Sequence, residues 1–138
     1  SFEHAVHATA GRGILTSAHV ILGLPGESRN QMRQTSDYIA RLPIDGIKLH
    51  LLYVIKGTPL ERLYQSGKYR CLHREEYIDL VCDVLERLPD KMVIQRLTGD
   101  PHRHELVAPL WALEKNENVA LIKQRLEERD AWQGKRLT

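Results

Sequence analysis

The stretch His19-Val-Ile-Leu-Gly-Leu-Pro-Gly-Glu27 decides the fold class of this chain. An apolar run of strand type, Val20 to Leu22, ends at a Gly-Leu-Pro-Gly turn, after which Glu27 and Ser28 open a helix. A buried strand that leads through a tight glycine turn into a helix is half of a βαβ unit. Because α/β proteins bind ligands at the carboxyl ends of parallel strands, the turn is also a candidate site.

Two further apolar runs complete a predicted sheet of about three mostly parallel strands with flanking helices, which is an α/β fold. The expected strands are 17–24, 46–54 and 92–97, and the expected helices are 2–10, 29–42, 59–67, 74–88 and 117–129. Three strands with helices on one side do not close a barrel. We therefore expect an apolar inner face that another part of the protein covers, or through which the isolated chain self-associates.

Composition excludes several classes of protein. The chain has 138 residues, 42% of them hydrophobic, and a formal net charge of +2, so it lacks the basic surface of a nucleic-acid binder. Its apolar runs are too short to span a membrane and no signal-peptide pattern opens it. Two cysteines, Cys71 and Cys82, provide no disulfide framework and indicate a cytoplasmic location.

The chain reads as a piece of a longer protein. It begins with Ser1 rather than methionine, and its first predicted helix has no strand before it. We expect residues 1–130 to belong to one domain and residues 131–138 to be a disordered tail.

The loops that follow the three strands carry the residues most suited to ligand binding. Parallel strands bring loops 23–28, 55–58 and 98–105 to one edge of the sheet. Polar and cationic side chains lie in or next to these loops: His50, Tyr53, Lys56, Arg96, His102, Arg103 and His104. Such a mouth suits an anionic or nucleotide-like ligand.

Each candidate also has a purely structural interpretation. The glycine turn can be a simple strand-to-helix connection, and it matches neither a phosphate-binding loop nor a dinucleotide-binding fingerprint. His50 lies on an apolar strand, where it is either a core histidine with a partner or a ligand contact. His102 and His104 lack the further ligands that a metal site needs. The sequence shows no hydrolase triad order.

Three segments together carry a family resemblance. His19 to Glu27 resembles the fifth-strand signature of radical S-adenosylmethionine (radical SAM) enzymes, and Asp45 to Leu60 resembles their sixth strand and the following loop. With Gln95-Arg-Leu-Thr-Gly-Asp100 and Leu106-Val-Ala-Pro-Leu-Trp111, the chain is similar to the YhcC-like branch, which is related to the radical SAM domain of the Elongator catalytic subunit. The resemblance covers nearly the whole chain up to about Arg129.

The resemblance implies a fragment of a partial (β/α)₆ barrel from an Fe–S oxidoreductase type of enzyme. In that family a [4Fe-4S] cluster cleaves SAM reductively and starts radical chemistry on a substrate, which this sequence does not identify. The implied SAM contacts are Ile21, Gly23, Leu24, Pro25, Gly26, Glu27, His50, Leu51, Leu52 and Tyr53. The residues expected to face the substrate or the SAM carboxylate are Lys56, Arg96, His102 and Arg103.

The chain departs from the family pattern in ways that limit its activity. The cysteines of the cluster motif are absent, so we expect the cluster ligands to lie upstream and this fragment to be inactive alone. His19 also stands where many branches have glycine. Two other interpretations stay open: a non-catalytic α/β ligand-binding or interaction module, and a role in RNA modification, which the near-neutral charge does not support.

Overall fold

A parallel three-stranded sheet forms the centre of the fold. The computed structural model describes residues 1–137 of the chain. The strands are β1 (Ser17–Leu22), β2 (Gly46–Leu51) and β4 (Val93–Arg96), in the order β1-β2-β4. Both pairings are parallel, as predicted. The sheet and its flanking helices confirm the predicted α/β class.

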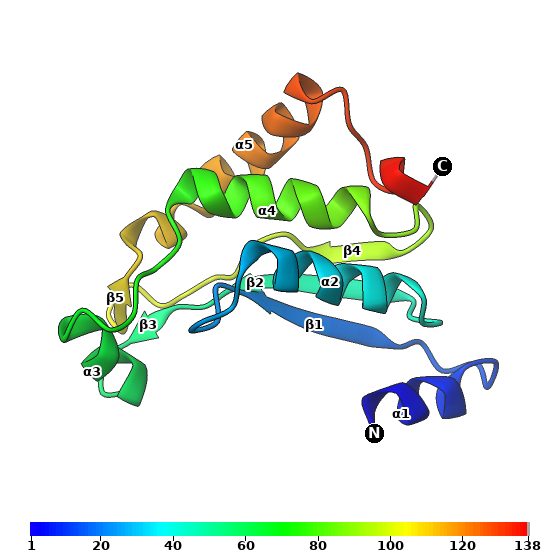
Figure 1. The fold of residues 1–138 in the computed structure, drawn as a ribbon, viewed down its shortest axis with the longest axis horizontal. Helices are drawn as coiled ribbons and strands as arrows, with labels where there is room; N and C mark the ends of the chain where they lie inside the picture. Colours follow the sequence, from blue (N-terminus) through cyan, green and yellow to red (C-terminus); the bar gives the residue numbers. More distant parts are fainter. Residues whose placement is uncertain (138) are drawn as a thin grey trace.

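Helices cover one face of this sheet (Figure 1). The α-helices are α1 (Phe2–Thr9), α2 (Arg29–Ala40), α3 (Pro59–Gln65), α4 (Arg74–Glu86) and α5 (Lys115–Glu128), and the two 3₁₀ helices are η1 (Leu110–Leu113) and η2 (Lys135–Leu137). Helices α2 and α4 pack against each other over the sheet, and α5 packs on the outside of α4.

Local capping explains where the helices begin. The Ser28 hydroxyl accepts a hydrogen bond from the Gln31 backbone amide, and the Gln31 side-chain oxygen accepts one from the Ser28 backbone amide, which fixes the first turn of α2. At α3 the Thr58 hydroxyl accepts a hydrogen bond from the backbone amide of Glu61, and Pro59 occupies the first helical position.

The core lies between the sheet and these helices. Alternate residues of β1 are buried toward α2, and Ile47, Leu49 and Leu51 of β2 lie beside them. Helix α4 supplies fully buried side chains such as Tyr77 and Ile78. Burying this apolar surface is the main stabilisation of the fold.

The face of the sheet opposite the helices is polar, so the expectation of an apolar inner face is wrong. On β1 the residues of this face are Ser17, His19 and Ile21, all exposed, and on β2 they include Lys48 and His50, both half-buried. Strand alternation places every second residue on the same side. We call this surface the open face.

The second predicted strand ends three residues early, at Leu51. Val54 and Ile55 instead form a separate strand, β3, which pairs antiparallel with β5 (Leu106–Ala108). This small sheet lies beyond the carboxyl ends of β1 and β2 (Figure 1). It has its own core, in which Val54, Tyr69 and Ala108 are buried together.

The segment expected as a disordered tail includes the short helix η2 (Lys135–Leu137), and Thr138 lies outside the described residues. The side-chain amide of Gln133 donates hydrogen bonds to the carbonyl oxygens of Pro89 (2.7 Å) and Met92 (2.8 Å). These contacts hold the segment against the connection between α4 and β4. Among residues 1–137, no helix combines the length and the apolar character that crossing a bilayer requires.

We predict that the isolated chain self-associates through strand β1, which forms one edge of the sheet and contains the exposed Ile21. Unpaired strand edges bind other strands readily, and a lysine on such an edge opposes this. Sedimentation should show a concentration-dependent dimer that Ile21→Lys weakens. A single monomeric species at high concentration would contradict the prediction.

Candidate functional site

The strand register gathers basic side chains on the open face. His19 lies opposite Lys48 across the β1–β2 pair, and Lys48 lies opposite Arg96 across the β2–β4 pair. One row further toward the carboxyl ends, Ile21 lies opposite His50. Three strands thus contribute to one surface, beside the loops that leave the sheet.

His50 is the most unusual member of this surface. Its ring stacks on the ring of His19, with centroids 5.3 Å apart and an interplanar angle of 18°. Its Nε2 atom is buried and has no hydrogen-bond partner within the described residues. Burial lowers the pKa of His50, and the nearby charges of His19, Arg96 and Lys48 lower it further. The imidazole is therefore held toward its neutral form.

Tyr53, two residues after the end of β2, also carries an unsatisfied polar atom. Its hydroxyl is buried without a hydrogen-bond partner in the described part of the chain. The hydroxyl lies against Gly99, where an added Cβ would be 1.6 Å from it, so only glycine fits there. Burial, with a smaller contribution from the charge of Asp100, raises the pKa of Tyr53 to about 12.

The glycine turn after β1 is fixed by a buried hydrogen bond. Gly23 has a φ of +94°, a conformation that side-chain-bearing residues rarely adopt. Its carbonyl oxygen accepts a hydrogen bond of 2.6 Å from the Tyr69 hydroxyl. Burial raises the pKa of Tyr69 to about 12, so this phenol stays a donor at neutral pH. The turn is consequently held in place before any ligand binds.

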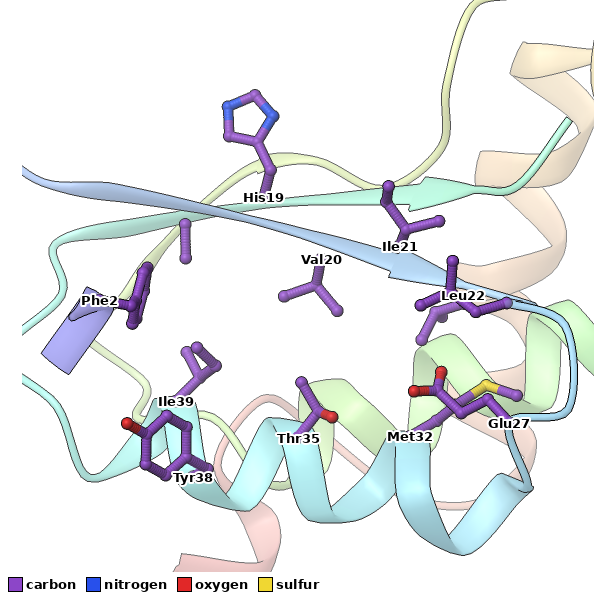
Figure 2. A pocket seen from close by; sticks show the side chains of 12 residues that line it. Phe2, His19, Val20, Ile21, Leu22, Glu27, Met32, Thr35, Tyr38 and Ile39 are labelled. Carbon is purple, nitrogen blue, oxygen red and sulfur yellow. The ribbon is translucent and has the colours of Figure 1, made fainter.

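The residues after Gly23 lie on the helix side of β1. Leu24 and Glu27 line an apolar groove of about 380 Å³ between β1 and α2. Figure 2 shows Glu27 on this side, with Met32 and Thr35 of α2, whereas the His19 ring points away from it. Burial raises the pKa of Glu27.

The sequence-predicted SAM contacts therefore divide between two surfaces. His50 and Tyr53 lie at the open face or at its carboxyl-end edge, whereas Leu24 and Glu27 line the groove between β1 and α2, and Ile21, whose side chain alternates onto the open face, also borders that groove. Pro25 and Gly26 line a second pocket, of about 250 Å³, beside the turn. Its lining residues are Gly23, Leu24, Pro25, Gly26, Glu27, Met32, Lys68, Tyr69, Arg70 and Leu72.

The side chains of two predicted SAM contacts, Leu51 and Leu52, pack into the protein and leave little surface for a ligand. Leu51 is buried among the core residues beneath the sheet. Leu52 packs against the core of the small sheet, and its amide donates to the carbonyl oxygen of Leu22. Any contact from Leu51 would come from its backbone.

The four residues predicted to face the substrate lie in two different places. Arg96 lies at the end of β4, near His50 and Tyr53, whose pKa values its charge lowers. Lys56 follows β3, and its amide donates to the carbonyl oxygen of Glu105. That bond places it beside the turn that holds His102 and Arg103, which are exposed.

Sequence reasoning did not assign His19 and Lys48 to the site. Strand alternation could have found them. His19 lies two residues before Ile21, and Lys48 lies two residues before His50, so each shares a face of the sheet with a residue that was assigned to the site. The pairing of β1 with β2, which brings the two histidines into contact, could not be read from the alternation alone.

No group of three or more histidine, cysteine, aspartate or glutamate side chains that could hold a metal ion occurs within residues 1–137. Cys71 and Cys82 are both free thiols, and Cys82 is buried under α5, where it contacts the Ile122 carbonyl.

Comparison with known proteins gives consistent matches. The model of the Radical_SAM C-terminal domain family matches residues 44–128. The chain is 39% identical over 134 residues to uncharacterized protein YtqA of Bacillus subtilis, covering 97% of the chain and 42% of that protein. It is 28% identical over 110 residues to protein YhcC of Escherichia coli, covering 80% of the chain and 36% of that protein.

A solved structure has the same fold. It is titled as the archaeal Methanocaldococcus infernus Elp3 with an N-terminal deletion, and it superposes with a TM-score of 0.80 at 20% identity over 96% of this chain and 31% of that one. The chain thus spans about two fifths of the length of the curated relatives YtqA and YhcC. Its sequence and fold place it in the Radical_SAM C-terminal domain family.

Proposed function

We propose that this chain forms part of a radical SAM enzyme and that the open face, with the turn after β1, lines the side of the SAM site that this part of the enzyme supplies. Family membership implies SAM and a [4Fe-4S] cluster in full-length members. In a full-length member the cluster would supply the electron for reductive cleavage of SAM, the chemistry with which this family starts radical reactions on a substrate.

The observation that carries the proposal is a concentration of unsatisfied polar atoms at the mouth of the sheet. Among the described residues, His50 Nε2 and Tyr53 Oη are both buried there without a hydrogen-bond partner. Leaving such an atom unpaired costs on the order of 1–3 kcal/mol. A ligand rich in donors and acceptors offsets that cost, and the adenine and ribose of SAM have this character.

The residues present fit SAM but not the cluster. Gly26 has a positive φ angle and nothing within 4 Å of the position a Cβ would take, which leaves room for a flat ring to approach the turn, whereas at Gly23 the Leu72 side chain packs into that space. The two cysteines of the chain are too few for a three-cysteine cluster motif. We propose that the cluster ligands come from another part of the full-length protein and that the chain is inactive alone.

The direct test is anaerobic cluster reconstitution of the full-length protein that carries this chain. With dithionite and SAM we expect release of 5′-deoxyadenosine and methionine. The 138-residue chain alone should release neither. A full-length protein that binds neither cluster nor SAM would contradict the proposal and favour a non-catalytic module.

A pair of glycine variants tests the role of the turn. Gly23→Val adds a side chain whose Cβ would lie 3.3 Å from the Leu72 side chain, in a backbone conformation that valine rarely adopts. It should weaken SAM binding about tenfold or more, the equivalent of about 1.4 kcal/mol, without changing the cluster absorbance.

Gly13→Val is the matched control, because Gly13 also has a positive φ, of 74°, but lies before β1 at the opposite end of the sheet. Its SAM affinity, measured by calorimetry, should stay within about twofold of the unmodified protein. Equal losses in both variants would show that backbone strain, rather than the turn's position, governs binding.

A further inference from the structure

The open face carries positive charge without a counter-charge. His19, Lys48 and Arg96 form a row across the three strands, and His50 lies one row further along. Among the described residues, neither Lys48 nor Arg96 has an ion-pair partner. The groups that shift the pKa of His50 are all basic, and Asp100 influences Tyr53 instead.

On the helix side of the sheet, by contrast, the arginines form ion pairs. Arg129 contacts the carboxylates of Asp79, Asp83 and Glu86 at 3.0, 2.9 and 2.8 Å. Arg125 likewise contacts several acids of α4 and α5. Arg125 and Arg129 are thus ion-paired with carboxylates, whereas Lys48 and Arg96 on the open face have no such partner among the described residues.

This arrangement is unfavourable for the chain by itself. Basic groups that face one another repel, and the neighbouring charges already disfavour protonation of His50. The buried Nε2 atom of His50 adds an unsatisfied hydrogen-bonding group at the same place. An anion removes both costs, because it attracts each cation and accepts hydrogen bonds from them.

We propose that His19, Lys48, His50 and Arg96 form a subsite for an anionic group, a carboxylate or a phosphate, of a ligand bound against the open face. The inference deepens the proposed function and rests on it for the identity of that ligand. The anion belongs either to the carboxylate of SAM or to the substrate. Arg96 presents a planar fork suited to two oxygens, and Lys48 contributes a point charge from the neighbouring strand.

Inorganic phosphate is a suitable probe, titrated into the full-length protein at constant ionic strength. Histidine side-chain NMR, with His50 assigned from a His50→Gln variant, should show a saturable shift. Phosphate should also raise the pKa of His50, because the bound anion favours the protonated imidazole. Acetate should produce a similar, weaker effect.

Three variants separate the subsite from general charge attraction. Lys48→Gln and Arg96→Gln should each weaken phosphate binding about tenfold, as expected for a lost charge-assisted hydrogen bond. Lys91→Gln removes the same charge from an exposed residue just before β4, at the opposite end of the sheet, and should change binding less than twofold. No saturable shift, or an equal loss in the Lys91→Gln variant, would overturn the proposal.

Repeating the titration with SAM bound identifies the source of the anion. Competition between SAM and phosphate assigns the subsite to the SAM carboxylate, and unchanged phosphate affinity assigns it to the substrate. SAM binding is measured separately by calorimetry. A protein that binds SAM but not phosphate refutes the subsite alone, and one that binds phosphate but not SAM refutes the proposed function alone.

Discussion

The parallel register between β1 and β2 is the constraint on which the rest of the structure depends. It pairs Ser17 with Gly46 and continues in step to Leu22 and Leu51. The same register buries Val20 and Leu49 against the helices and brings His19 and His50 into contact on the other face. A slip of one residue would exchange the two faces. The Asp45 carboxylate holds the start of the register by accepting a hydrogen bond from the Thr16 amide at 2.7 Å.

The two sides of the sheet have opposite physical character. On the helix side, the sheet and α4 supply an apolar core, and outside it α4 and α5 are joined by arginines that each contact several carboxylates. On the open side, basic groups and buried polar atoms are left without partners among residues 1–137. The first side stabilises the fold by itself, and the second is the side that we propose to bind a ligand.

Much of the fold could be predicted because its signals are local. The strand around Val20, the glycine turn, and the cap at Thr58 each depend on residues close together in the sequence. The small sheet of β3 and β5 was missed because its strands have only two and three residues, too few for a periodic pattern. The contacts of residues 131–137 were equally hidden, because Gln133 donates to carbonyl groups more than forty positions away in the sequence.

The site was predicted less completely, and for a similar reason. Strand-exit loops could be located, but which side chains meet depends on register and on residues from distant segments, such as Tyr69 at Gly23 and Gly99 at Tyr53. The polar character of the open face is visible in the alternation around His19 and Lys48. This polar character was overlooked in the sequence because the residues between these polar positions are strongly apolar.

Hydrogen–deuterium exchange of the reconstituted full-length protein, with and without SAM, tests the central claim that SAM binds against the open face and its turn. The account predicts slower exchange in peptides that cover residues 21–27 and 50–53, with α5 (Lys115–Glu128) unchanged as an internal reference. SAM binding that leaves both of those segments unprotected, or that protects the α4–α5 side alone, would contradict it.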